Sequence, residues 1–172
     1  MAPFDFVITG FSQMLAGLDG QIEKSDAHLI AKGSTFEDLL GRRLAPDMFP
    51  LAAQIQFTCQ QAEEPSYYLL GETPRQVSPI TSLQEARDQI ARTRLRLAQA
   101  DREAIDRGAA RSIALILATG NIFDMTGADY VRDWAVPQFH FHLVASYAIM
   151  RHAGVELGKR DYVPHMIRHI RH

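Results

Sequence analysis

The chain has 172 residues, of which 47% are hydrophobic and 22% are charged, and its formal net charge is −2. These values fit one globular domain over residues 1–172, and they exclude the strongly basic surface that nucleic-acid binding requires. Cys59 is the only cysteine, so no intramolecular disulfide can form. No apolar run reaches the length of a membrane span, and the first residues lack the basic region of a signal peptide, so we expect a cytoplasmic protein.

The first predicted helix runs from about Pro3 into the twenties. Its apolar residues recur at three- and four-residue steps, which predicts a buried face. These residues are Phe4, Ile8, Phe11, Leu15, Leu18 and Ile22. Gly17 and Gly20 either weaken this helix or let a neighbouring segment approach closely. A short capped turn that ends at Leu40 is predicted after a stop at Gly33.

The second predicted helix begins near Pro46 and Pro50, because proline is tolerated in the first turn of a helix. Pro65 lies inside its helical pattern and is predicted to kink or end the helix there. Residues 71–79 then form a loop. The inner face of this helix is expected to consist of Met48, Leu51, Ile55, Thr58, Cys59 and Ala62.

The third predicted helix has the clearest start signal, a capping box formed by Ser82 and Glu85. Residues at helical spacing continue its inner face as far as Ala104. The other face carries many charged side chains. This pattern indicates a solvated surface with i,i+4 ion pairs such as Asp88 with Arg92.

The pattern changes between Ser112 and Thr126, where two short runs favour β-structure. The runs SIALILA and NIFDMT are separated by a Thr-Gly-Asn turn, which predicts a hairpin. A two-stranded hairpin is marginally stable by itself, so we expect it to pack against the end of the helices.

The last predicted helix is capped at its start by Thr126 and Asp129 and is followed by Gly154. Pro137 is predicted to break it into residues 128–136 and 138–153. Together the elements predict an all-α protein, a four-helix bundle with a short β-hairpin before the last helix.

His142 is the most informative residue of the last helix. On a helical wheel of about 100° per residue, its neighbours are small, apolar or uncharged. They are Ala135, Gln138, Ser146, Ile149 and Ala153. His142 is therefore predicted to face the core, whereas His140 points to nearly the opposite side. A buried imidazole needs partners for both ring nitrogens, and a structural hydrogen bond, a metal or an acid–base role would each supply one.

The spacing around His142 lacks a local metal signature. Histidine and carboxylate ligands on one helix converge on an ion when they are three or four positions apart. Four positions before His142 the chain has Gln138, a neutral amide and a poor ligand for a transition metal.

The second helix offers amides and one thiol to a site that contains His142. Its glutamines, including Gln54, suit the orientation of a polar ligand better than proton transfer. Cys59 is either an inert small hydrophobic residue or a soft ligand or nucleophile. The candidate ligand-binding residues are His142, Gln138, Gln54 and Cys59.

Two segments resemble the signature segments of a known family: LAPDMFPLAAQIQ at Leu44–Gln56 and PQFHFHLVASYAIMRHAGVELGKRDY at Pro137–Tyr162. It is a bacterial and fungal domain-of-unknown-function family in the DinB-like (YfiT-like) metalloenzyme superfamily, and the resemblance covers essentially the whole chain. It implies a DinB-like four-helix bundle that is often a homodimer. Many superfamily members hold a divalent metal with three histidines, one on helix two and two at i,i+4 on the last helix.

Matched by position, His142 is the second of the last-helix histidines and Gln138 stands at the first, while helix two has no histidine. The resemblance therefore implies a degenerate metal site that retains His142, with a divalent ion such as zinc or nickel as its cofactor if one is bound. Three functions follow as hypotheses. The chain binds a small polar ligand in a pocket between helices two and four; or it is a divalent-metal-dependent enzyme of the thiol-transferase or hydrolase type that uses His142; or it is a non-catalytic dimeric interaction protein.

Overall fold

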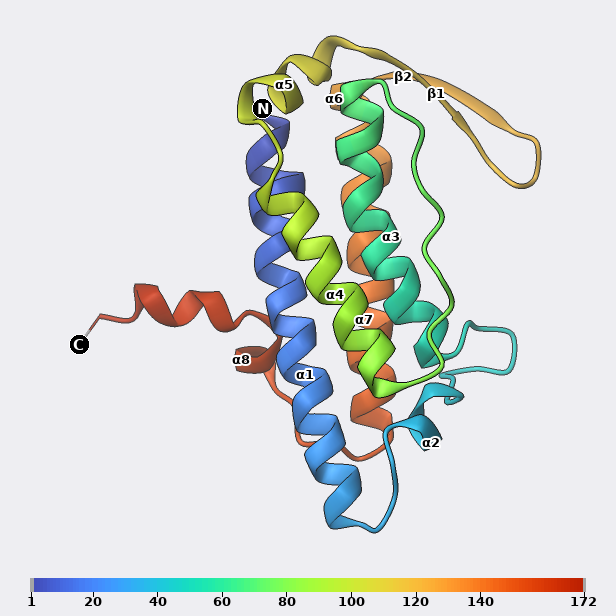
Figure 1. Ribbon diagram of the computed structural model, residues 1–172, viewed down its shortest axis with the longest axis vertical. Helices are drawn as coiled ribbons and strands as arrows, with labels where there is room; N and C mark the ends of the chain where they lie inside the picture. Colours follow the sequence, from blue (N-terminus) through green and yellow to red (C-terminus); the bar gives the residue numbers. More distant parts are fainter. Residues whose placement is uncertain (1, 172) are drawn as a thin grey trace.

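The computed structural model describes residues 2–171, and four long helices form its bundle (Figure 1). These are α1 (Phe11–Ala31), α3 (Leu51–Leu70), α4 (Leu83–Ala98) and α7 (Val136–His152). The short helices are α2 (Glu37–Leu40), α5 (Arg102–Arg107), α6 (Gly127–Tyr130) and α8 (Lys159–Tyr162). The predicted all-α bundle with a hairpin before its last helices is confirmed.

The core lies where α3 packs against α7 and α4, and where α1 packs against α4 and α7. The rings of Phe11 on α1 and Phe139 on α7 stack with 4.0 Å between their centroids. Full burial of one such side chain contributes about 1.5–3 kcal/mol. Each long helix supplies fully buried apolar residues, among them Leu18, Ile22, Ile55, Ile90, Leu97 and Leu143.

Helix α3 continues through Pro65, so the prediction that this proline kinks or ends the helix is wrong. Proline removes one backbone donor from a helix. However, Pro65 is buried, and Tyr67 and Leu69 beyond it are only 5% and 1% exposed. The packing of this last turn therefore outweighs the lost hydrogen bond. The helix ends at Gly71, whose φ of 78° suits glycine.

The break predicted at Pro137 is also wrong, because α6, a π-helical segment (Val131–Ala135) and α7 follow one another without interruption. The backbone N–H of Val136 bonds to the carbonyl of Val131, five positions earlier. This wider turn lies directly before Pro137, whose nitrogen has no hydrogen to donate. The change of hydrogen-bond register thus accommodates the proline.

Helix α4 begins as predicted but ends earlier. The Ser82 side chain accepts a hydrogen bond from the Glu85 backbone nitrogen, which confirms Ser82 as the N-cap, whereas the Glu85 carboxylate accepts from the backbone nitrogen of Thr81 instead of that of Ser82. The helix ends at Ala98 instead of continuing to Ala104. Asp101 accepts a hydrogen bond of 2.7 Å from the Ala104 nitrogen and starts α5. This second cap divides a pattern that periodicity alone presented as one helix.

The predicted hairpin is present as β1 (Ser112–Ile116) and β2 (Ile122–Thr126), which pair antiparallel. It extends from the end of the bundle that also carries α5 and α6 (Figure 1). Ile113 and Leu115 are 4% and 3% exposed, so these two side chains attach the hairpin to the core as expected.

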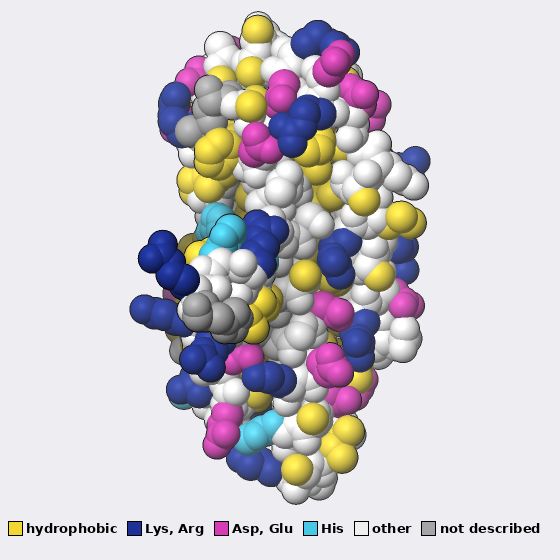
Figure 2. Space-filling view, turned by 90° about the vertical axis from the view of Figure 1, so that its left-hand side faces the viewer, with side chains coloured by type: hydrophobic (Ala, Val, Ile, Leu, Met, Phe, Trp, Pro, Cys, Tyr) yellow, Lys and Arg dark blue, Asp and Glu magenta, His cyan; other side chains and the backbone are white. Residues whose placement is uncertain are grey.

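The C-terminal segment returns to α1. Helix α8 lies beside α1, and the 3₁₀ segment that follows it (Pro164–His169) extends away from the bundle (Figure 1). Asp161 forms an ion pair with Lys24, and Gln21 Nε2 donates to the Asp161 carbonyl at 3.0 Å. Basic and acidic side chains are intermixed over the face drawn in Figure 2, and basic ones are most crowded at its left edge. Within residues 2–171, no helix combines the length and the apolarity needed to cross a membrane.

Candidate functional site

His142 of α7 faces Gln54 of α3 across the contact between these two helices. Its Nδ1 lies 2.8 Å from Gln54 Oε1. His142 is 9% exposed and Gln54 is 1% exposed, so the imidazole is buried as its helical position predicts. The pair joins two long helices whose contact is the most extensive in the bundle.

The surroundings of Gln54 assign the proton of His142. Gln54 Nε2 donates to the carbonyl of Phe49 at 3.3 Å, which leaves the amide oxygen facing the imidazole. Nδ1 must therefore carry the hydrogen and donate it, and the other ring nitrogen, Nε2, keeps a lone pair. Within residues 2–171 no hydrogen bond reaches this Nε2.

Burial lowers the pKa of His142 to about 4, because desolvation disfavours the charged imidazolium. The hydroxyls nearby do not bond to the ring. Thr58 Oγ1 donates to the Gln54 carbonyl at 2.8 Å, and Ser146 Oγ donates to the His142 carbonyl at 3.0 Å. The ring is therefore a neutral hydrogen-bond acceptor at physiological pH.

Aromatic rings flank His142 and lead from it toward the surface. The ring centroids of Phe57 and Phe141 lie 5.1 Å and 5.3 Å from that of His142, and Phe49 lies 4.9 Å from Phe57. Phe49 and Phe141 are 55% and 58% exposed. These rings are not among the site residues predicted from the sequence. A signal was available, since Phe57 is three positions after Gln54 and Phe141 is adjacent to His142.

The other two predicted ligand-binding residues differ in position. Gln138 lies one turn before His142 on α7, is half-buried, and forms no side-chain hydrogen bond within the described part of the chain. Cys59 is fully buried on the side of α3 that contacts α4, near Thr93. Burial raises the pKa of its thiol to about 12. Gln138 therefore belongs beside His142, whereas Cys59 is a core residue directed at α4.

The donor set around His142 does not fit a tightly held transition metal. A hydrogen bond from Nδ1 to an amide oxygen is how ligating histidines are often oriented. However, a catalytic zinc ion usually has three protein ligands, and over residues 2–171 no three His, Cys, Asp or Glu side chains are grouped to hold an ion. His142 and the neutral Gln138 supply one good ligand.

The bundle, with an inward imidazole on its last long helix, is of the DinB-like class. Residues 4–163 match the family described as Domain of unknown function (DUF1993), and the chain belongs to this family. It is 31% identical to a DinB family member protein from Shewanella denitrificans, whose crystal structure superposes with a TM-score of 0.85 over 93% of this chain and 90% of that chain. A comparison with curated proteins gave no match. The resemblance inferred from residues 44–56 and 137–162 is thus confirmed.

Proposed function

We propose that this DinB-like chain binds a small uncharged molecule between α3 and α7. In this proposal Nε2 of His142 accepts a hydrogen bond from a hydroxyl or amide group of the ligand, and the rings of Phe57 and Phe141 pack against its apolar part. The observation that carries the proposal is the 2.8 Å contact of His142 Nδ1 with Gln54 Oε1, which directs the lone pair to the other nitrogen.

The charge state of the site favours an uncharged ligand. The pKa of His142 is lowered to about 4, so the ring carries no charge to attract an anion. The polar residues around it, Gln54, Gln138 and Ser146, are neutral. A base with so low a pKa is also a weak proton acceptor near neutral pH, which favours binding over general-base catalysis.

Small aromatic probes test this proposal. Phenol and benzamide each combine a ring with one neutral donor, whereas benzoate has the same ring with a charge. In protein with ¹⁵N-labelled histidine, the two neutral probes should shift the Nε2 resonance of His142, and benzoate should not. His142→Asn should abolish saturable binding of both, and His152→Gln, at the exposed end of α7, should leave it unchanged. Equal binding by His142→Asn would contradict the proposal.

The metal-dependent alternative has its own test. Protein purified without a histidine tag should contain less than one divalent ion per chain, and titration with Zn²⁺ or Ni²⁺ should not displace the Nε2 resonance of His142 at stoichiometric metal. A stoichiometric ion that is lost in His142→Ala would replace the proposal with a metalloenzyme that uses this residue.

The outer face of α7 favours homodimer formation as a second function. Phe141 and Val144 lie three positions apart on this face and are 58% and 47% exposed. Contiguous exposed apolar side chains often mark a protein interface. If a second copy covers this face, Val144→Lys should convert a dimer to a monomer in analytical ultracentrifugation. Ile30→Lys, which alters a still more exposed apolar residue near the end of α1, should have no effect.

A further inference from the structure

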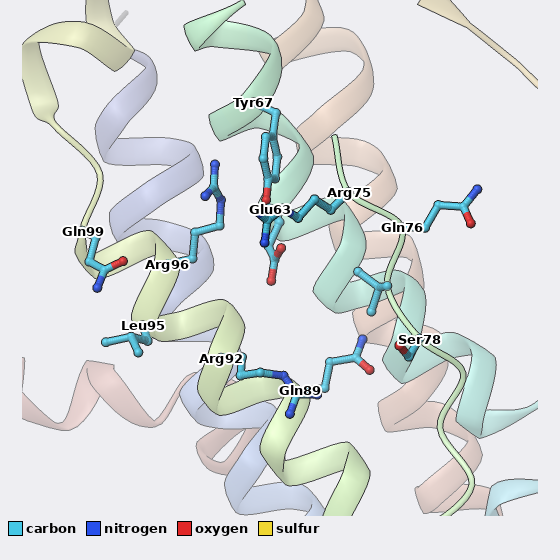
Figure 3. Close-up of a pocket in the computed structure, with 11 residues that line it drawn as sticks. Glu63, Tyr67, Arg75, Gln76, Ser78, Gln89, Arg92, Leu95, Arg96 and Gln99 are labelled. Carbon is cyan, nitrogen blue, oxygen red and sulfur yellow. The ribbon is translucent and has the colours of Figure 1, made fainter. Parts of the chain in front are cut away.

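A hollow of about 360 Å³ lies between α3, α4 and the segment that joins them, and its lining does not include His142 or the aromatic rings beside it (Figure 3). Its volume falls within the range of small-molecule sites, about 300–1,000 Å³. Helix α3 contributes Glu63 and Tyr67 to its lining, and α4 contributes Gln89, Arg92 and Arg96. The outer wall is the extended segment, which carries Arg75.

Arg96 is held in a fixed position at this hollow. Its guanidinium lies over the ring of Tyr67, 3.7 Å from the centroid. Its Nε donates to Ser66 Oγ at 3.3 Å, and it forms an ion pair of 3.5 Å with Glu72. Three separate contacts therefore orient this cation, and its charge is already balanced by a carboxylate.

Arg75 and Arg92, by contrast, form no ion pair within residues 2–171. The predicted partner of Arg92, Asp88, instead accepts a hydrogen bond of 2.8 Å from Gln84. Figure 3 shows Arg75 reaching from the outer wall across the hollow toward α3, while Arg92 extends from α4. Two guanidinium groups without an ion-pair partner thus border one hollow from opposite walls.

Gln89 and Glu63 contribute an uncharged amide and the carboxylate of the lining. Gln89 is 4% exposed, and its Nε2 is buried with no hydrogen-bond partner in the described part of the chain. Glu63, the acidic residue of the lining, already accepts a hydrogen bond of 2.6 Å from Thr93. The lining holds Arg75, Arg92 and Arg96 against one carboxylate, so its positive charge exceeds its negative charge.

We propose that this hollow binds a small organic oxyanion, a carboxylate or phosphate compound, between Arg75 and Arg92. Guanidinium groups bind both kinds of oxyanion through paired charge-assisted hydrogen bonds. The side chain of Tyr67 forms one side of the hollow. The site is separate from His142, which lies on the α7 side of α3.

The outer wall gives this site a means to enclose its ligand. Residues 71–81 contain no helix or strand until α4, and Gln56 Nε2 donates to the carbonyl of Val77 at 3.0 Å. This hydrogen bond ties the wall to α3 beside the hollow. A ligand that contacts both Arg75 and Arg92 would link the wall to α4 as well.

Titration with inorganic phosphate and with glutarate, at constant ionic strength maintained with chloride, tests the proposal in the intact chain. At least one probe should give saturable changes in the amide resonances of residues 75–78 and of the Gln89 side chain. Arg92→Gln and Arg75→Gln should each weaken binding at least about fivefold, which corresponds to about 1 kcal/mol. Arg94→Gln removes an equally exposed charge from α4 outside the hollow and should change affinity less than about twofold.

The two probes distinguish the sources of the oxyanion, because a site for phosphate esters should prefer phosphate and a site for organic acids should prefer glutarate. Thermal unfolding of each variant checks that its fold is intact, and the two arginine variants, on different elements, test the site independently. Linear changes without saturation, or equal weakening by Arg94→Gln and Arg92→Gln, would overturn the proposal.

Discussion

The imidazole of His142 and the amide of Gln54 are separated by 88 positions in the chain, yet their Nδ1 and Oε1 atoms lie 2.8 Å apart. The amide nitrogen of Gln54 is held by the Phe49 carbonyl, and Nδ1 of His142 is held by the amide oxygen of Gln54. The consequence is a single tautomer with an acceptor nitrogen on the side away from Gln54.

This relationship predicts the tautomer directly. In ¹⁵N–¹H spectra at neutral pH, Nδ1 of His142 should carry the proton and Nε2 should not. Gln54→Leu removes the acceptor and should destabilise the fold by about 1–3 kcal/mol, because a buried donor is left unpaired. Gln138→Leu, which removes an amide without a partner on the next turn, should change stability by less than about 0.5 kcal/mol. A protonated Nε2 in the wild-type protein would contradict this assignment.

Stability should also depend on pH through His142. Its pKa falls from 6.5 to about 4 on folding, so between these values the unfolded chain binds more protons than the folded chain. The stabilisation from the neutral ring is thus fully present above pH 6.5 and is lost as the pH falls toward 4. Urea unfolding at pH 7 and pH 5 should show that wild type loses about 1–2 kcal/mol more than His142→Asn. Equal losses would show that the ring titrates normally.

Cys59 should be inert to thiol reagents while the protein is folded. It is fully buried, and burial raises its pKa to about 12, so the reactive thiolate is absent near neutral pH. Modification by a disulfide reagent should follow the rate of unfolding and accelerate with urea. A thiol introduced by Ala91→Cys on the exposed face of α4 should react immediately. Rapid reaction of Cys59 without denaturant would refute the core assignment.

Gly17 and Gly20 should respond oppositely to alanine. A Cβ at Gly17 would lie 3.0 Å from the Tyr162 carbonyl oxygen, whereas a Cβ at Gly20 has no atom within 4 Å. Gly20→Ala should stabilise the protein by up to about 1 kcal/mol through helix propensity. Gly17→Ala should be less stable than Gly20→Ala by about 1 kcal/mol or more, because α8 must move away from α1. Denaturant unfolding measures both, and an equal gain would show that the two segments are not closely packed.

The helix starts could be predicted because their signals are local. Ser82 and Thr126 each accept a hydrogen bond from a backbone nitrogen three residues later, so the capping residue and its partner are adjacent in sequence. The helical spacing of apolar residues likewise predicted that His142 faces the core. The predictions at the two prolines were wrong because the loss of a backbone hydrogen bond is a local effect, whereas its compensation depends on the packed bundle. Buried residues surround Pro65, and a π-helical turn precedes Pro137.

The sequence by itself thus determined the helical class, the hairpin and the inward face of α7, all of which follow from spacing within one segment. Only the tertiary structure decided that Gln54 is the partner of His142, that Cys59 faces α4, and that Arg75 and Arg92 border one hollow. The physical reason is that a hydrogen bond or an electrostatic site depends on distances of a few ångströms between side chains. Such distances between separate helices are fixed by how those helices pack, which no local pattern records.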